Sequence, residues 1–339
     1  SARRIKPGAE VDGLLQRALD EAYAAGLFGR AIFGTGYSLD CYLHRGAGAY
    51  VCGEETGLIE SLEGKRGWPR IKPPFPAVEG AFSCPTVVNN VETLCCLPHI
   101  VERGAEWFRA IGTPGSAGPK LYTVSGPVNR PGCYEAPLGL RVRELVYGDD
   151  FARGMAGGMK LKGVIPGGLS VGILTADELD CKLDFDDPGR HGLLGLGTAG
   201  AIVIADDTPI VDVLVNTARF FAHESCGQCT QCREGTTWMG KIAERIARGA
   251  GRPQDLDLLE EVAASMGMMP GLSICGLPDG AAFALRTIVR KYRKELEAYI
   301  AAQPQGQAEG ILASVNRSAY ELPISGRLTR PKALQAREI

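Results

Sequence analysis

Four cysteines constrain this chain more than any other feature. Three stand in the run Cys226-Gly-Gln-Cys229-Thr-Gln-Cys232, and Cys275 follows alone in Ser-Ile-Cys-Gly-Leu. A two-residue spacing lets one turn of chain direct three thiolates at a single inorganic centre, and a remote fourth cysteine can close it. This ligand set is typical of four-iron clusters. The sequence therefore predicts a 4Fe-4S cluster held by these four residues, and with it the transfer of single electrons.

Zinc is the main alternative, and plain thiols are the other. Zinc sites more often pair two C-x2-C knuckles or include histidine. The sequence has no second such pair, and of its four histidines only His223 is near the triplet. The pattern favours iron over zinc.

Composition excludes several classes of function. The net charge of −2 over 339 residues leaves no basic footprint for nucleic acid. The longest apolar runs, such as residues 199–205, are too short to cross a bilayer, and the basic N-terminus lacks the apolar stretch of an export signal. Eleven cysteines, mostly scattered singly, favour a reducing compartment. We expect a soluble cytosolic or matrix-side protein.

Residues 1–112 are expected to form a first domain. Apolar residues at helical spacing predict a helix over residues 11–22, which Gly26 ends. Two short strands are predicted at residues 30–33 and 39–44.

A glycine- and proline-rich stretch with little periodicity follows over residues 46–85. Loops of that length inside a compact domain are usually functional or disordered, and the Glu, Asn and aromatic residues here favour a binding loop. Residues 91–109 are predicted to be helical, with an interruption near Pro98.

The Gly/Pro/Ser-rich stretch 113–119 suggests a boundary, after which residues 117–207 form a second domain. Four short strands and one helix fit a small α+β module better than a βαβ unit. The strands are predicted at residues 120–124, 132–135, 163–165 and 201–205, and the helix at 141–146.

A third domain, residues 208–303, is predicted to be helical. Asp206-Asp207-Thr208-Pro209 opens it, and Asp279 is expected to cap its last helix. Four amphipathic stripes with short connections indicate a four-helix bundle. The cysteine triplet falls between the first two helices and Cys275 before the fourth, so bundle folding can gather the sulfurs. Residues 304–339 are expected to form a tail. The stripes are Ile210, Val213, Leu214, Thr217, Ala218 and Phe221; Met239, Ile242 and Ile246; Leu258, Leu259, Val262 and Met266; and Phe283, Ile288, Val289, Tyr292, Leu296 and Tyr299.

The run Gly195-Leu-Gly197-Thr-Ala-Gly200 matches the dinucleotide fingerprint G-x-G-x-x-G. That fingerprint has meaning only after a strand and at the start of a helix. Here it leads into Ala-Ile-Val-Ile-Ala, a strand pattern, so we interpret it as a turn.

A second candidate site is the run Gly46-Ala-Gly-Ala-Tyr50-Val-Cys-Gly53-Glu54-Glu55-Thr-Gly. Its glycines would let the backbone approach a ligand closely. The alternative is a surface turn with solvated acids. For Lys72 the alternative is an ordinary surface amine, and for Asn89 and Asn90, with Thr93 downstream, a helix cap.

Taken together, these strings resemble one family. Gly-Ala-Gly-Ala-Tyr-Val-Cys-Gly-Glu-Glu-Thr-Gly, Ser-Leu-Glu-Gly, Lys-Pro-Pro-Phe-Pro, Val-Asn-Asn-Val-Glu-Thr-Leu and Glu-Ser-Cys-Gly-Gln-Cys-Thr-Gln-Cys-Arg-Glu-Gly occur here in order. The same order is found in the flavin-carrying, NADH-oxidising subunit of respiratory complex I, which is known as the 51-kDa type. The resemblance runs from about residue 10 to residue 300. Sister subunits of NAD-linked hydrogenases and formate dehydrogenases share this core.

The resemblance implies an α/β and α+β multidomain fold with a partial Rossmann-like flavin and NADH domain, a ubiquitin-like (β-grasp) domain and a helical iron–sulfur domain. The 4Fe-4S ligands would be Cys226, Cys229, Cys232 and Cys275. FMN would be bound by residues matching Tyr50, Gly53, Glu54, Glu55, Asn89, Asn90 and Thr93, and NADH by Glu54, Glu55 and Lys72.

The resemblance also implies an oxidoreductase. A hydride would pass from NADH to FMN, and single electrons would pass to the 4Fe-4S cluster and onward toward quinone. The implied partners are a two-iron, 24-kDa-type subunit and a large multi-cluster subunit. The chain would lie on the inner face of the cell membrane, or on the mitochondrial matrix side, held there through the complex. A flavin-less electron-relay or scaffold subunit is the alternative.

One departure from the family stands out. The family carries a glycine-rich loop of the type Gly-Arg-Gly-Gly-Ala-Gly-Phe, well before the position matching Ser1, that cradles the FMN phosphate. This sequence has no such loop. We expect either an N-terminally incomplete version of the family, or flavin binding that is lost or completed by another polypeptide.

Overall fold

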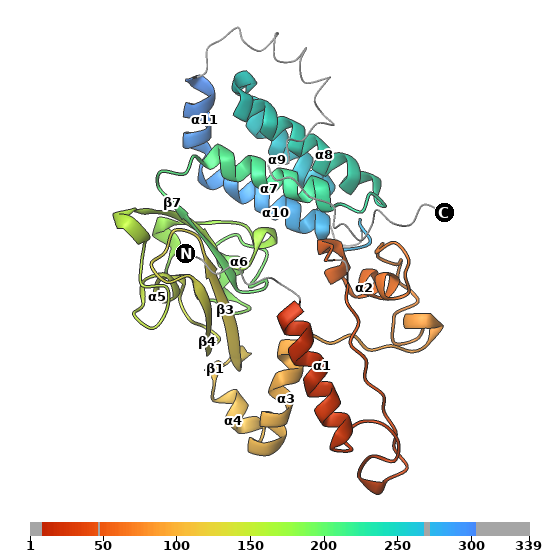
Figure 1. The fold of residues 1–339 in the computed structure, drawn as a ribbon. Helices are drawn as coiled ribbons and strands as arrows, with labels where there is room; N and C mark the ends of the chain where they lie inside the picture. Colours follow the sequence, from red (N-terminus) through yellow and green to blue (C-terminus); the bar gives the residue numbers. More distant parts are fainter. Residues whose placement is uncertain (1–8, 47, 268–271, 303–339) are drawn as a thin grey trace, which may run out of the picture. The chain divides into compact units, whose positions relative to one another are not determined.

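The computed structural model describes residues 9–46, 48–267 and 272–302 (Figure 1). The chain divides into two compact units, Ser1–Val87 and Val88–Ile339, and each is described by itself. The tail expected at residues 304–339 lies outside the described residues.

The first unit begins with helix α1 (Ala9–Ala24), which confirms the predicted helix. Gly26 follows it at a φ of +72°, a conformation that glycine adopts without strain. The strands predicted at 30–33 and 39–44 are wrong. The chain makes one isolated bridge between Gly29 and Leu39 and a 3-10 turn at Ile32–Gly34. Positive φ angles at Ala31 and Phe33 break the extended backbone there.

The 46–85 stretch is not all loop, because helix α2 (Glu55–Leu62) lies inside it. Gly57 weakens the helical signal of its sequence. The fold nevertheless requires a small residue there, since a Cβ on Gly57 would lie 3.1 Å from the Val51 carbonyl oxygen. Packing therefore outweighs propensity in this helix.

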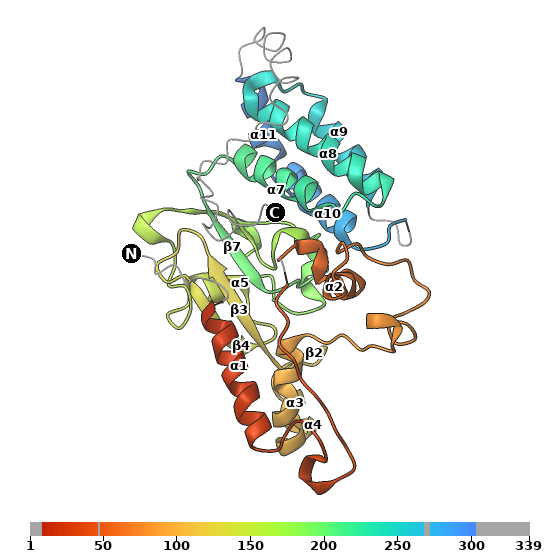
Figure 2. The same ribbon diagram turned by 45° about the vertical axis from the view of Figure 1, so that its right-hand side comes forward.

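The first unit buries few apolar side chains. Among its described residues, Ile32 and Ile59 are the buried hydrophobic ones. Figure 2 shows the long, largely irregular connection between α1 and α2. Its exposed large hydrophobic side chains include Leu14, Leu15, Leu27, Phe33, Tyr37, Leu39, Tyr42, Tyr50, Leu58, Leu62, Trp68, Ile71, Phe75, Val78 and Phe82.

The second unit opens with helices α3 (Val91–Arg103) and α4 (Ala105–Arg109). The helical region is interrupted at Gly104, where φ is +88°, and not at Pro98, which α3 accommodates. The stretch 113–119 is not a free linker, because β1 (Gly112–Thr113) pairs antiparallel with β2 (Ser116–Ala117).

A five-stranded mixed sheet follows, in the order β4-β3-β7-β5-β6. Strands β3 and β7 are parallel, and the other neighbours are antiparallel. The four predicted strands and the helix are confirmed, while the two-residue β6 was not predicted. Side chains such as Tyr122, Leu145 and Val164 are fully buried in its core. The elements are β3 (Pro119–Ser125), β4 (Gly132–Pro137), α5 (Val142–Tyr147), β5 (Leu161–Ile165), β6 (Leu174–Thr175), α6 (Asp187–Arg190) and β7 (Gly200–Ala205).

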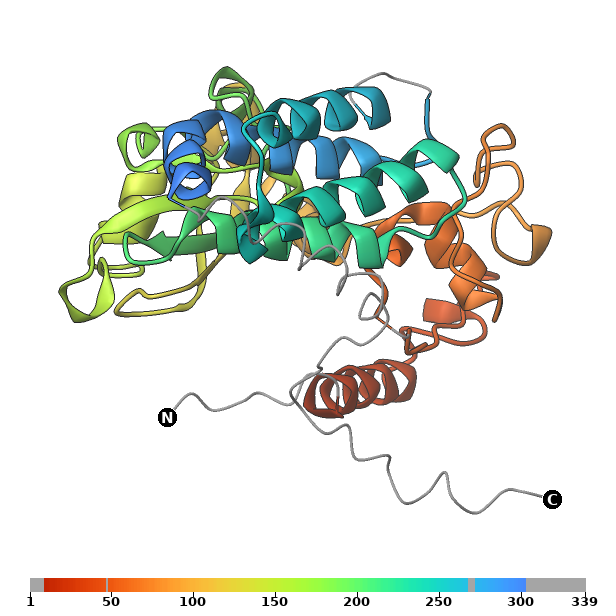
Figure 3. The ribbon, with the colours of Figure 1, turned by 90° about the horizontal axis from the view of Figure 1, so that it is seen from above.

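The rest of the described chain is helical. Helix α7 packs on α8, α8 on α9, α9 on α10 and α10 on α7, as Figure 3 shows from above. Apolar side chains such as Leu214, Phe221 and Met239 are buried between them. The helices are α7 (Ile210–Glu224), α8 (Thr230–Arg245), α9 (Asp255–Met266), α10 (Leu277–Lys291) and α11 (Arg293–Ala301).

Two details of the helical prediction are wrong. The fourth stripe is divided between α10 and α11, because the backbone leaves the helical region at Tyr292. Asp279 lies in the first turn of α10, and Gly276 takes the N-cap position.

An ion-pair group fixes the start of α9. Asp255 is fully buried and accepts hydrogen bonds from Arg245 Nε (2.9 Å), Arg252 Nε (3.2 Å) and the Arg252 backbone N–H (2.9 Å). A buried carboxylate requires such partners to offset its lost hydration.

No helix of the described residues is long and apolar enough to cross a bilayer.

Candidate functional site

The cysteine triplet lies where α7 gives way to α8. Cys226 and Cys229 lie in the connection, and Cys232 lies in the first turn of α8. Gly227 has a φ of +80°, which lets the chain turn sharply between the first two cysteines. Arg233 holds the turn by donating from Nη1 to the Gly227 carbonyl at 2.8 Å.

The remote cysteine comes to the same place. The backbone N–H of Ile274 donates to Cys229 Sγ at 3.4 Å, which joins segments 45 residues apart. Ser273 Oγ donates to the Cys275 carbonyl at 2.9 Å and fixes the approach to α10. Gln231 also donates to the carbonyl of Leu272. The two predicted ligand segments therefore lie side by side.

The surroundings of Cys232 show the same convergence. Its side chain is buried, and burial raises the pKa of the thiol to about 11. Repulsion from Cys275, Cys229 and Cys226 adds to that rise in pKa, whereas a 3.3 Å contact with Ser225 Oγ opposes it. Cys232 thus lies within electrostatic range of the other three sulfur groups.

The chemistry of the donors bears on the choice between zinc and iron. The donor set, four cysteines with a backbone N–H aimed at one sulfur, fits a four-iron cluster.

The second candidate site lies in the first unit, where Lys72 joins the two glutamates. Its Nζ donates to Glu54 Oε1 at 2.9 Å and to Glu55 Oε1 at 2.6 Å. Glu54 Oε2 accepts hydrogen bonds from the N–H groups of Thr56 and Gly57, both at 2.9 Å, so Glu54 also caps α2. The alternative of solvated acids therefore fails for Glu54, and Lys72 is not an ordinary surface amine.

The charges of this group support one another. Burial of Glu54 opposes ionisation, but hydrogen bonds from Thr56, Gly57 and Lys72 outweigh it and lower the pKa of the carboxyl below its usual value. The Glu55 hydrogen bond, followed by that of Glu54, raises the pKa of Lys72. The site therefore holds an ionised carboxylate beside a protonated amine at neutral pH.

Tyr50 and Gly53 lie just before this group, in the 3-10 turn Tyr50–Gly53 that leads into α2. The Tyr50 side chain is 45% exposed. The turn therefore presents an aromatic side chain within five residues of both glutamates.

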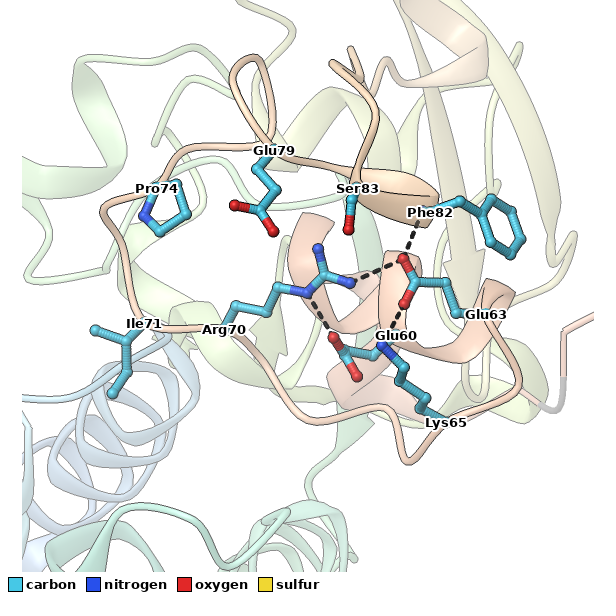
Figure 4. Close-up of a pocket in the computed structure, with 9 residues that line it drawn as sticks. All are labelled: Glu60, Glu63, Lys65, Arg70, Ile71, Pro74, Glu79, Phe82 and Ser83. Atoms are coloured by element: carbon cyan, nitrogen blue, oxygen red, sulfur yellow. Dashed lines mark hydrogen bonds and ion pairs between the residues drawn. The ribbon is translucent and has the colours of Figure 1, made fainter.

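A pocket of about 540 Å³ lies in the same unit, and Ile71, which precedes Lys72 in the chain, is one of its lining residues. Figure 4 shows Arg70 at its centre, with Glu60 and Glu63 pointing at the guanidinium. Arg70 Nε donates to Glu60 Oε1 at 2.5 Å, and Nη2 donates to Glu63 Oε1 at 3.0 Å. A hydrogen bond from Lys65 is the main cause that lowers the pKa of Glu63 to about 2. None of these residues is among the predicted site residues, although Glu63 stands in the string Ser-Leu-Glu-Gly that contributes to the family resemblance.

Asn89, Asn90 and Thr93 belong to the second unit and are exposed. Asn90 Oδ1 accepts a hydrogen bond from the Thr93 N–H at 3.2 Å and caps α3, so the helix-cap alternative holds for Asn90. The Gly195–Gly200 run leads into β7 and opens no helix, which confirms that it is a turn.

Comparison with known proteins defines the class. Residues 9–99 match the Nuo51 FMN-binding domain, residues 121–173 the SLBB domain, and residues 212–299 the NADH-ubiquinone oxidoreductase-F iron–sulfur binding region. The chain therefore combines, in this order, a region similar to an FMN-binding domain, an SLBB-like region and a region similar to an iron–sulfur binding domain.

Relatives define the family. The chain is 49% identical over 286 residues to the NADH-quinone oxidoreductase F subunit 2 of Rhizobium meliloti (strain 1021), covering 84% of this chain and 66% of the relative. It is 48% identical to the mitochondrial NADH dehydrogenase [ubiquinone] flavoprotein 1 of Dictyostelium discoideum, covering 84% of this chain and 58% of the relative. With the NADH-quinone oxidoreductase F subunit of Rickettsia conorii (strain ATCC VR-613 / Malish 7) the identity is 46%, covering 84% of this chain and 67% of the relative.

The chain belongs to the family of NADH-quinone oxidoreductase F subunits. It spans 58% to 67% of the length of these three relatives. Among solved structures, an NAD+-reducing [NiFe]-hydrogenase in the air-oxidised state is similar, with a TM-score of 0.68 and 40% identity over 84% of this chain and 48% of that one.

Proposed function

We propose that this chain is the NADH-oxidising subunit of an NADH:quinone oxidoreductase and that it carries a 4Fe-4S cluster and FMN. The observation that carries the proposal is the meeting of Cys229 and the Cys275 segment through the Ile274 N–H, inside a region that matches the iron–sulfur domain of the family. When bound, FMN supplies the means to take a hydride from NADH and to release its electrons singly.

The cluster would be held by Cys226, Cys229, Cys232 and Cys275. The Ile274 N–H donates to one of these sulfurs, and such a contact raises the potential of a cluster by stabilising negative charge. Arg233, next to Cys232 in the chain and paired with Glu234 at 3.0 Å, fixes the Gly227 turn.

The nucleotide would be bound by the group of Glu54, Glu55 and Lys72. Carboxylates accept hydrogen bonds from ribose hydroxyl and amide N–H groups, and the ammonium group balances their charge. Because Lys72 bonds to both glutamates, it holds the two carboxylates side by side. Tyr50 and Gly53 would pack near the flavin ring, and Asn89, Asn90 and Thr93 would meet its polar edge.

We assign the domains as a partial Rossmann-like flavin and NADH domain over residues 1–112, a β-grasp domain over 117–207 and a four-helix iron–sulfur domain over 208–303. The strand order β4-β3-β7-β5-β6, with its parallel central pair, supports the second assignment. The mutual packing of α7, α8, α9 and α10 supports the third.

The partners would be a two-iron subunit and a large multi-cluster subunit, which accept electrons from the helical domain. The chain would then lie on the inner face of the cell membrane through the complex. The similar [NiFe]-hydrogenase structure favours a second candidate, the same module in an NAD-linked hydrogenase. That candidate shares the NADH chemistry and differs in the final acceptor.

The test is reduction of ferricyanide by NADH, measured on the chain purified within its complex with flavin and iron quantified. The proposal predicts NADH-dependent reduction that Lys72→Ala weakens through a raised KM for NADH, with iron content unchanged. A complex that contains iron but no flavin and does not oxidise NADH would establish a flavin-less relay instead. Addition of a quinone analogue or of hydrogen then separates the two acceptors.

A further inference from the structure

A second group of metal-ligating side chains converges within the sheet domain, away from the four cysteines. Cys181, Asp187 and His191 each offer one ligand atom, and the three atoms all lie within 4.8 Å of one another. Among the described residues no other set of three such side chains is as close. We infer that these three residues form a binding site for a divalent transition-metal ion such as Zn²⁺.

The chemistry of the donors supports this assignment. Thiolate, imidazole and carboxylate are the three ligand types that zinc takes in proteins. A thiolate from Cys181 and a carboxylate from Asp187 together balance the charge of a dication. The soft sulfur selects against Mg²⁺ and Ca²⁺, which prefer oxygen.

The local structure brings the three ligands together. Asp187 opens the short helix α6 and His191 closes it, so the two lie one turn apart on one side of the chain. The Lys182 backbone N–H, next to Cys181, donates to Asp187 Oδ2 at 2.7 Å. This bond draws the cysteine segment toward the start of α6.

The distances fit a metal better than a hydrogen bond. His191 Nε2 and Asp187 Oδ2 are 3.8 Å apart, which is too long for a hydrogen bond. Two nitrogen or oxygen ligands on a tetrahedral zinc lie roughly 3.4 Å apart, given bonds of about 2.1 Å. A small rotation of the imidazole would therefore complete the geometry.

A carboxylate stands behind the imidazole, as is usual for metal-bound histidine. Glu178 Oε1 lies 3.8 Å from His191 Nδ1. Lys291 Nζ fixes Glu178 with bonds of 2.8 and 2.7 Å and also donates to the His191 carbonyl at 2.9 Å. Helix α10 thereby orients the proposed ligand from outside.

Access is possible from one side. Cys181 is fully buried, whereas the side chains of Asp187 and His191 are 18% and 28% exposed. A metal would enter past the histidine and keep a water molecule as its fourth ligand, an arrangement typical of zinc with three protein ligands.

The test uses the purified protein with its iron content measured, dialysed against chelator and then titrated with Zn²⁺. X-ray absorption at the zinc edge reads the ligands directly, and bound iron does not interfere. We expect one zinc with a single sulfur at about 2.3 Å and nitrogen or oxygen neighbours at about 2.0–2.2 Å.

Cys181→Ala and His191→Ala should each weaken zinc binding at least tenfold, with iron content unchanged. Cys133→Ala is the matched control, because Cys133 is an exposed cysteine on β4 of the same sheet, and it should bind zinc as the wild type does. A zinc with four sulfur ligands, or unchanged affinity in both Cys181→Ala and His191→Ala, would overturn the inference. Because iron is measured separately, this failure is distinct from failure of the proposed function.

Discussion

The two candidate sites of this molecule are built in opposite ways. The cysteine site lies at the ends of helices whose side chains are buried against one another, with Leu214, Phe221 and Met239 between them. The Glu54, Glu55 and Lys72 site lies in a unit that buries few apolar residues, and ion pairs and a helix cap hold it. The first site therefore depends on packing and the second on charge, which makes their responses to mutation and pH different.

The largest effect should come from breaking the cysteine site. Cys229→Ser should lose most of the bound iron and lower the thermal midpoint of the helical region by about 10 °C, because loss of a bound metal is among the most costly single changes. Iron analysis and circular dichroism check this. Cys133→Ser, at an exposed position, is the control and should change neither quantity. Full iron content in Cys229→Ser would remove that residue from the ligand set.

The next effect tests whether buried charge, as well as apolar packing, holds the helices. Asp255→Asn should destabilise the protein by about 3 kcal/mol, because it leaves Arg245 without its buried carboxylate. Asp257→Asn is the matched control two residues on, in a pair with Arg293 whose aspartate side chain is 71% exposed, and should cost less than about 0.5 kcal/mol. Urea unfolding compares the two. Equal losses in the free energy of unfolding in the two variants would show that the buried ion pair contributes no more than the exposed one.

The buried Asp255 carboxylate also sets the direction in which the stability of the protein changes with pH. Burial opposes ionisation of Asp255, but hydrogen bonds from Arg245 and Arg252 outweigh it and lower its pKa below the usual value. Its contribution is therefore full above the pKa of an unfolded aspartate, about 3.9, and is lost as pH falls through the lower folded value. The stability difference between wild type and Asp255→Asn should narrow below about pH 4. A constant difference would contradict the ion-pair explanation.

The smallest expected effect distinguishes the roles of Glu54 and Glu55, the two neighbouring glutamates that pair with Lys72. Glu54→Gln should raise the hydrogen-exchange rate of the Thr56 and Gly57 amides about fivefold, because the side chain that caps them loses its charge, worth about 1 kcal/mol. Glu55→Gln removes only a bond to Lys72 and should leave those amides unchanged. Similar rates in the two variants would mean that Glu54 has no capping role.

The difference between the sites also explains what could be predicted from sequence. Apolar stripes such as Leu214 and Phe221 report burial directly, so the helices on either side of the cysteine triplet were predicted. Their bounds were not, since the second stripe begins at Met239 and α8 begins nine residues earlier, at Thr230. In the first unit, Gly57 weakens the helical pattern of α2, so that helix was not predicted. The positive φ angles of Ala31 and Phe33 interrupt the stretch that was predicted to be a strand. Backbone conformations of that kind depend on contacts that a sequence pattern does not contain.

The same holds for the site residues. The meeting of Cys275 with the triplet followed from its place before a helix of the same bundle. The joining of Lys72 to Glu54, 18 residues away, had no signal in periodicity, because the chain between α2 and Lys72 is irregular; only the family resemblance grouped these residues. Arg70, which lines the pocket in the same unit, likewise had no signal in the sequence.

The most direct test of the account is the electron paramagnetic resonance spectrum and iron content of dithionite-reduced Cys275→Ser, compared with wild type. The account predicts that this single change, 43 residues from Cys232, abolishes the reduced four-iron signal and lowers the iron content while Cys133→Ser retains both. An unaltered signal and full iron in Cys275→Ser would show that the remote cysteine does not belong to the centre, and the account would be wrong.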